Sequence, residues 1–198
     1  KKEKRCEYAL GLESLIAELN TMYKEEKLLY GLDDKKESLI WIDHEANVDN
    51  VITFMRKGSK KNEILYVIAN FSNVSYDSLN ITVPFAGKYK EILSTEEARF
   101  AGNAFCNDKE IATEEKPYDE TISTLNVKSA PMSVSVFTYR PFTAKELAAI
   151  AEHKRQLRIA YVKAERAKIE KRRDELIAEA IKDAETRIKE LEKILEDK

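Results

Sequence analysis

Apolar residues recur at spacings of three and four between residues 5 and 28. The row consists of Leu12, Leu15, Ile16, Leu19, Met22 and Tyr23. This spacing predicts an amphipathic helix, because residues three and four apart share one face of a helix. Gly31 and the pair Asp33 and Asp34 end the pattern. One helix cannot bury its own apolar row, so we expect this helix to lie against another part of the protein.

Between residues 38 and 139 the pattern changes from that of a helix to that of strands. Seven short runs are rich in β-branched and aromatic residues, and turn-forming residues separate most of them. The runs are SLIWID, NVITFMR, EILYVIANF, SLNITV, KYKEIL, TISTLNV and MSVSVFTY. Because no helical pattern lies between them, they predict an antiparallel sandwich or barrel. We expect residues 94–120 to form a long polar connection within it.

Residues 143–198 return to a helical pattern. All five glycines precede residue 103 and all four prolines precede residue 142, so neither breaks a helix here. Thr143 and Glu146 have the spacing of a capping box, in which a hydroxyl and a carboxylate satisfy the first backbone N–H groups. A continuous helix of this length is about 84 Å long at 1.5 Å per residue. We therefore expect a long charged helix that projects or forms a coiled coil.

Two apolar rows of different phase lie along this last segment. The first row is Leu147, Ile150, Leu157, Tyr161 and Ala164, and the second is Ile177, Ile181, Ala184, Ile188, Leu191 and Leu195. The almost wholly charged stretch ERAKIEKRRDE separates them. The slip of three residues resembles a stammer, so we expect a bend or a change of partner near residues 171–174.

The tail seam is the name we give to the large apolar residues of the second row. Its members are Ile177, Ile181, Ile188, Leu191 and Leu195. This seam is too apolar to remain in water unaided, so we expect it to be buried against another copy's tail or against the helix at residues 5–28. The alternative is a single exposed helix that its many charged pairs stabilise.

Composition narrows the class of protein. The chain has 198 residues, 35% of them charged, with a net charge of −2. That balance disfavours a nucleic-acid binder, which needs a concentrated basic face, and no apolar run approaches the roughly 20 residues of a membrane span. Cys6 and Cys106 have no metal-ligand spacing, and we expect two free thiols in a reducing compartment rather than a disulfide. The start at Lys1, without Met, leads us to expect a fragment.

Few residues suggest chemistry. His44 and His153 are expected on the surface, and no Ser-His-Asp or Cys-His arrangement and no glycine-rich phosphate loop is present. We therefore expect no catalytic residue, no metal site and no cofactor. Trp41 is the best candidate for stacking on a sugar ring, with Tyr89 and Tyr118 behind it. Packing in the core or at a domain interface is the alternative for Trp41.

Residues 17–139 contain several short sequence motifs that occur in one known family. They are LNTMYKEEKLLYGLD at 19–33, WID at 41–43, VITFMRKG at 51–58, VIANFSNV at 67–74, VPFAGKYKEIL at 83–93 and FAGNAFCN at 100–107. In this order and at these intervals they resemble the C-terminal part of 1,4-α-glucan (glycogen) branching enzymes, members of the α-amylase superfamily. The chain departs from the family at Ala101 and Gly102, where two glycines are usual, and at Ser94–Glu96.

The resemblance implies a division of the chain into three parts. Residues 1–30 would be the last helix of a catalytic (β/α)₈ barrel that is missing here, with Leu12, Leu15, Ile16 and Leu19 against that barrel. Residues 31–142 would be a C-terminal β-sandwich of the α-amylase type. Residues 143–198, a long charged helical tail, lie outside the shared family core. The family's catalytic carboxylates lie on barrel strands, so none transfers to this chain.

The resemblance also orders the functional hypotheses. The first is a non-catalytic accessory domain of an enzyme that cuts an α-1,4-glucan and rejoins it through an α-1,6 bond, in the cytoplasm. The second is a free carbohydrate-binding module that uses Trp41. The third is a helical interaction or oligomerisation protein that uses the tail seam. The expected partners are accordingly a catalytic barrel, an α-glucan bound by the parent enzyme, and a second copy through the tail.

Overall fold

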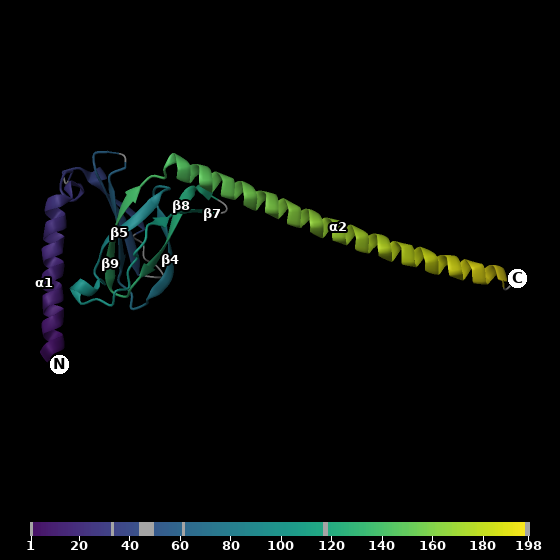
Figure 1. Cartoon of the computed structure of the whole chain (residues 1–198), viewed down its shortest axis with the longest axis horizontal. Coiled ribbons are helices and arrows are strands. Elements are labelled where there is room, and N and C mark those ends of the chain that lie inside the picture. Colours follow the sequence, from purple (N-terminus) through teal and green to yellow (C-terminus); the bar gives the residue numbers. More distant parts are fainter. Residues whose placement is uncertain (1, 33, 44–49, 61, 117–118, 197–198) are drawn as a thin grey trace. The chain divides into compact units, whose positions relative to one another are not determined.

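The structure is a computed structural model that describes residues 2–32, 34–43, 50–60, 62–116 and 119–196. The chain divides into two compact units, Lys1–Phe142 and Thr143–Lys198. The first unit contains a helix and an antiparallel sandwich, and the second contains one long helix (Figure 1). His44 lies outside the described residues.

Helix α1 (Lys2–Glu25) opens the first unit, and two short 3-10 turns follow it, η1 (Lys27–Leu29) and η2 (Lys36–Ser38). Each of the seven predicted runs contains a strand: β1 (Leu39–Asp43), β2 (Val51–Lys57), β3 (Ile64–Asn70), β4 (Tyr76–Val83), β5 (Lys88–Ser94), β8 (Asp119–Ser129) and β9 (Ser133–Arg140). The sequence therefore predicted the principal strands and the fold class correctly.

The expected polar connection after β5 is more structured than predicted. It holds a 3-10 turn, η3 (Ala98–Phe100), and two short strands, β6 (Ile111–Ala112) and β7 (Glu114–Lys116). Strand β6 is only two residues long, and the three residues of β7 carry no apolar side chain. They form because β5 and β8 offer them backbone partners, which no pattern within the segment itself indicates.

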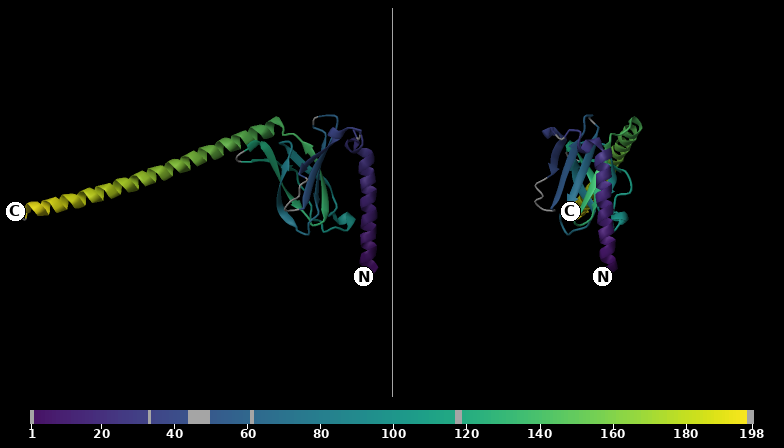
Figure 2. Two further views of the ribbon diagram at one scale, coloured as in Figure 1. Left: turned by 180° about the vertical axis from the view of Figure 1, so that it is seen from behind. Right: turned by 90° about the vertical axis from the view of Figure 1, so that its left-hand side faces the viewer.

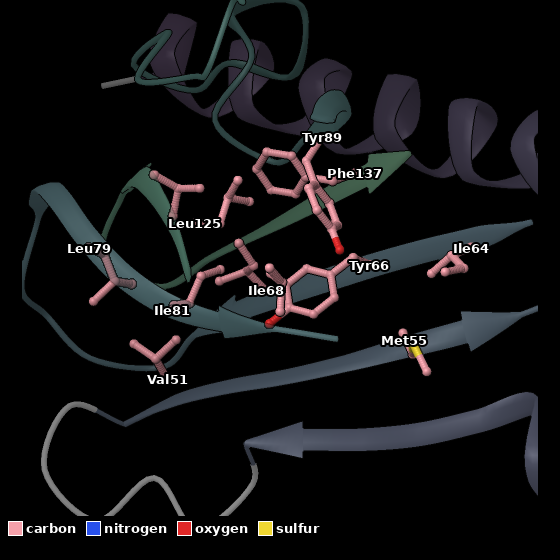
Figure 3. Packing of buried hydrophobic residues seen from close by; sticks show 12 residues of the cluster. Val51, Met55, Ile64, Tyr66, Ile68, Leu79, Ile81, Tyr89, Leu125 and Phe137 are labelled. Atoms are coloured by element: carbon pink, nitrogen blue, oxygen red, sulfur yellow. The ribbon is translucent and has the colours of Figure 1, made fainter. Parts of the chain in front are cut away.

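The strands form two sheets with every pairing antiparallel. The larger sheet has the order β1-β2-β3-β9-β5-β6 and the smaller has the order β4-β8-β7. Apolar side chains from both sheets meet in a core (Figure 3). At its centre the Tyr66 hydroxyl donates to the Thr82 carbonyl at 2.7 Å and the Tyr89 hydroxyl donates to the Phe85 carbonyl at 3.1 Å. Two buried hydroxyls thus keep hydrogen-bond partners within an apolar core.

Strand β3 is buried on both of its faces along all seven residues. One face contributes Ile64, Tyr66 and Ile68 to the core between the sheets. The other contributes Leu65 and Val67 to a second cluster on the outside of the larger sheet. A strand buried on both sides needs a continuous apolar run rather than alternation, which explains the sequence ILYVIAN.

The second unit is one helix, α2 (Ala144–Glu196), of 53 residues. Its start has the predicted capping box, because the Thr143 N–H donates to Glu146 Oε2 at 2.9 Å and the Glu146 N–H donates to Thr143 Oγ1 at 3.3 Å. The helix runs without interruption through residues 171–174, where the sequence suggested a bend or a change of partner.

Candidate docking surface

Helix α1 runs along the outside of the larger sheet (Figure 2). Leu15 and Met22 are half-buried and pack into the second apolar cluster, which also contains Leu65, Val67, Leu93, Phe100 and Val136. Gly11 is buried on the same side of the helix. Positions 11, 15, 18 and 22 recur at spacings of four, three and four, so they form one face. We call this the sandwich face of α1.

Gly11 permits the close approach between α1 and η3. A Cβ atom added at Gly11 would lie 2.4 Å from the Phe100 carbonyl oxygen and 2.8 Å from the Ala101 Cβ. Both distances are shorter than van der Waals contact, and the first involves backbone that cannot rotate away. A glycine inside a helix costs about 1 kcal/mol relative to alanine. Here the cost is offset by contact between α1 and the loop.

Polar contacts fix the same helix at two further points. Arg99 pairs with Glu18 of α1 at 3.1 Å and with Glu97 at 2.7 Å. Beyond the end of α1, Arg56 Nη2 donates to the Leu29 carbonyl at 2.8 Å. Arg99 is about half-exposed, so its ion pairs contribute little stability. Their main effect is to orient η3 beneath the helix.

A second face of α1 carries large apolar side chains into solvent. Leu12 is 57% exposed, Ile16 51%, Leu19 40% and Tyr23 51%. We call these four residues the outer face of α1. At 3.6 residues per turn, the centre of this face lies about 100° around the helix from the centre of the sandwich face. The helix therefore has two apolar faces, one covered and one open.

This division corrects one expectation from the sequence. The resemblance implies that Leu15 lies with Leu12, Ile16 and Leu19 against a barrel, and the spacing puts Met22 in the same row. Leu15 and Met22 instead pack on the sandwich. Spacings of three and four residues predict a single stripe, but two stripes that adjoin on a helix show that same spacing.

Trp41 lies on the same side of the larger sheet as α1. In the strand register Trp41 is opposite Phe54, Phe54 is opposite Val67, and Val67 is opposite Val136. Residues directly opposite one another in an antiparallel sheet share a face. Val67 and Val136 belong to the cluster under α1, so Trp41 ends a row that begins beneath that helix. The Trp41 and Phe54 rings pack edge to face, with their centroids 5.4 Å apart. Trp41 is 51% exposed.

The two tyrosines suggested with Trp41 do not join it. Tyr89 is fully buried, and burial raises the pKa of its hydroxyl, so it belongs to the core and cannot stack on a sugar. Tyr118 lies outside the described residues. Trp41 itself remains an exposed aromatic side chain beside α1, which suits either a docking surface or a sugar contact.

The polar groups near η3 stabilise a loop. A cavity of about 350 Å³ is lined by Glu91, Glu97, Arg99 and Cys106 among others. Glu91 accepts hydrogen bonds from the Asn107 N–H and the Ser135 hydroxyl, and Glu97 accepts from the Ser94 N–H. Burial raises the pKa of the Cys106 thiol, which disfavours the thiolate form that a nucleophile requires. These groups therefore fit a structural role.

Other candidate groups are dispersed. Both cysteines are free thiols, as expected. His153 is exposed on α2. Within the described parts of the chain, no group of three or more His, Cys, Asp or Glu side chains could hold a metal ion, and no helix there is apolar enough to cross a membrane.

The tail seam is exposed in the single chain. Ile177 is 50% exposed, Ile181 and Ile188 are 55% and Leu191 is 61%. The side chain of Leu195 lies outside the described residues. The expectation that a partner buries this seam remains a prediction.

Known proteins are similar in sequence to the first unit. The family model described as "Alpha amylase, C-terminal all-beta domain" matches residues 41–140, about half of the chain. The protein named 1,4-alpha-glucan branching enzyme GlgB from Bacillus cereus (strain AH820) is 31% identical over 119 residues, which are 60% of this chain and 18% of the relative. Its namesakes from Prochlorococcus marinus (strain MIT 9211) and Parasynechococcus marenigrum (strain WH8102) are 33% and 35% identical over 129 and 131 residues.

The chain belongs to the family of α-amylase C-terminal all-β domains. The short sequence motifs predicted a resemblance to the C-terminal region of branching enzymes, and these relatives confirm it. The homology supports an accessory role for the domain. The chain spans less than a fifth of the length of these curated relatives, with 66% of its own residues matched in the Parasynechococcus protein.

Proposed function

We propose that this chain serves as the C-terminal accessory region of a 1,4-α-glucan branching enzyme, and that it supports a catalytic (β/α)₈ barrel without supplying catalytic groups. In this proposal residues 1–30 contain the last barrel helix, residues 31–142 form the accessory sandwich, and residues 143–198 form a separate tail. The parent enzyme would cut an α-1,4-glucan chain and rejoin it through an α-1,6 bond in the cytoplasm.

The observation that carries the proposal is the open outer face of α1. Leu12, Ile16, Leu19 and Tyr23 are 40–57% exposed on a helix whose other apolar face already packs on the sandwich. Exposed large side chains in a row disfavour the free state by about 25 cal/mol for each Å² of apolar surface. A partner that covers the row removes this cost, and a catalytic barrel is the partner that the resemblance to branching enzymes implies.

Trp41 extends this proposed docking surface. It lies on the α1 side of the sheet, at the end of the row that runs through Phe54 and Val67. A sugar-binding role for Trp41 needs several exposed aromatic rings in one patch, and Tyr89 is buried instead. We therefore favour a barrel contact for Trp41 over stacking on a glucan.

A binding experiment tests the proposal. The chain is mixed with the barrel portion of the Bacillus cereus relative, which lacks its own C-terminal region, and amide hydrogen exchange of α1 is followed. We expect slower exchange in α1 and a change in Trp41 fluorescence. Titration with maltoheptaose alone is expected to leave that fluorescence unchanged. Saturable quenching by maltoheptaose at micromolar concentration, without any response to the barrel, would instead favour a carbohydrate-binding module.

A further inference from the structure

Charge is unevenly distributed along the exposed helix α2. Residues 153–164 contain four basic residues and no acidic one: Lys154, Arg155, Arg158 and Lys163. Residues 174–185 contain five acidic residues and one basic one: Asp174, Glu175, Glu179, Asp183, Glu185 and Lys182. The first stretch we call the basic stretch and the second the acidic stretch. Two parallel helices in register would set each stretch against its own kind.

The two apolar rows of α2 match each other when one of them is reversed. With Lys154 in the gap of the first row, positions 147, 150, 154, 157 and 161 are separated by three, four, three and four residues. Read backwards, positions 191, 188, 184, 181 and 177 are separated by the same steps. Rows with steps of three and four pack as knobs into holes in a coiled coil. The first row of one helix therefore fits the second row of an antiparallel neighbour.

The side chains at these positions are complementary. An antiparallel alignment places Leu147 beside Leu191, Ile150 beside Ile188, Leu157 beside Ile181 and Tyr161 beside Ile177, while the Lys154 stem lies against Ala184. The described large residues other than Ile150 are 50–67% exposed in the single chain. The same alignment sets the basic stretch of one copy along the acidic stretch of the other. Residue 153 then lies opposite residue 185, and residue 164 lies opposite residue 174.

A second copy is the occupant that satisfies these constraints. Helix α2 is unbroken from Ala144 to Glu196 and contains no glycine or proline, so its two rows cannot meet within one chain. Residues 165–173, at the centre, carry ion pairs within their own helix, Arg166 with Glu170 at 2.9 Å and Lys168 with Glu165 at 2.7 Å. Apart from Ala167 and Ile169, which is 67% exposed, this stretch is charged, and it bridges the two contact regions.

We propose that α2 pairs with α2 of a second copy as an antiparallel two-stranded coiled coil, with its midpoint at Ile169. Two-fold symmetry repeats each contact, so both ends of the pair have the same apolar layers. Arg158 of one copy and Glu185 of the other lie along the same edge of the seam, about 7.5 Å apart along the axis at 1.5 Å per residue, which is within reach of the two side chains. The pairing covers the tail seam from Ile177 to Leu191 and makes the protein a dimer, independently of any catalytic barrel.

Cysteine crosslinking of the full chain determines the orientation. Cys6→Ser and Cys106→Ser remove the native thiols. Leu157→Cys is then mixed with Ile181→Cys, and each is also oxidised alone. We expect a disulfide-linked dimer only in the mixture, because the two Leu157 positions of an antiparallel pair lie about 36 Å apart along the axis at 1.5 Å per residue. Thr186→Cys, on the side of α2 away from the seam, is the unlinked control.

Three results of that experiment would overturn the proposal. Leu157→Cys linking to itself would indicate parallel helices. Linking of Leu157→Cys to Ile188→Cys in preference to Ile181→Cys would indicate a different register. No crosslink, together with a monomer mass in sedimentation equilibrium at micromolar concentration, would show that the seam has no second copy.

Charge reversal provides an independent readout. Arg158→Glu sets two like charges near each other at each end of the pair. We expect the dissociation constant of the dimer to rise at least about threefold at low salt. Adding Glu185→Arg restores opposite charges and should return the wild-type dissociation constant. Ile181→Gln with Ile188→Gln should give a monomer whose sandwich stays folded, and Lys182→Gln with Lys189→Gln is the matched control. Failure of the double reversal to recover, or unchanged mass in the seam variant, would contradict the pairing.

Discussion

The two long helices of this chain both place large apolar residues in solvent, but only α1 also has a covered apolar face. On α1 the sandwich face is held by Leu15 and Met22, by the close approach at Gly11 and by Arg99. In contrast, α2 is stabilised within its own unit by a capping box and by ion pairs three and four residues apart. An exposed apolar row on a helix that packs on the sandwich suggests a docking surface, whereas an exposed row on a helix that forms a unit of its own suggests association through that helix.

The largest expected effect comes from removing the anchor of α1. Leu15→Ala together with Met22→Ala should lower the free energy of unfolding by about 2–4 kcal/mol, since both side chains are half-buried in the outer cluster. Chemical denaturation of the first unit, with amide exchange of α1, measures it. Leu12→Ala together with Leu19→Ala, on the outer face, should cost less than about 1 kcal/mol. Equal losses for the two pairs would mean that α1 has no distinct sandwich face.

A smaller effect is expected at the point where α1 meets η3. Gly11→Ala should destabilise the first unit by roughly 1–3 kcal/mol, because the new Cβ overlaps the Phe100 carbonyl. An ordinary exposed helix would gain stability from the same substitution. Ala17→Gly, at an exposed position of the same helix, gives the reference cost of about 1 kcal/mol. A rise in thermal midpoint for Gly11→Ala would show that the close approach does not form.

A substitution at the residue after η3 tests the same contact, but here we expect a gain in stability rather than a loss. Ala101 has a φ of 63°, in the left-handed region that favours glycine. Ala101→Gly should therefore stabilise the first unit by about 0.4–1 kcal/mol. Met132 also has a positive φ, 51°, far from α1 in the sequence, and Met132→Gly is the matched comparison. A loss of stability at Ala101 alone would show that its methyl contact with α1 outweighs the backbone strain.

The smallest effect concerns the ion pairs of α2. Glu170→Gln removes the carboxylate that pairs with Arg166, and we expect a loss of about 0.3–0.5 kcal/mol that disappears at high salt. The helicity signal in circular dichroism against salt concentration measures this loss. Glu179→Gln, at a position that forms no ion pair with the described residues, is the control. An equal salt response in both variants would indicate a general charge effect rather than this pair.

Local patterns predicted most of the fold. The β-branched runs identified seven strands, and the glycine-free and proline-free tail identified α2. The two short strands β6 and β7 were missed, because neighbouring backbone rather than their own side chains determines them. The division of α1 into two faces was also missed, since spacing alone cannot assign adjoining rows to different partners. Gly11, a glycine inside a predicted helix, is the one signal in the sequence that indicates the close approach of α1 to η3.

The central claim is that the outer face of α1 docks on a catalytic barrel. A chimera tests it most directly, in which this chain replaces the matching C-terminal region of the Bacillus cereus branching enzyme and branching is followed by the iodine-stained spectrum of amylose. We expect branching by the chimera and none by the isolated chain. Leu12→Gln, Ile16→Gln and Leu19→Gln together should abolish branching by the chimera or lower its thermal midpoint by several degrees, while Glu13→Gln and Lys24→Gln should not. Unchanged activity and midpoint in the triple variant, or branching by the isolated chain, would contradict the account.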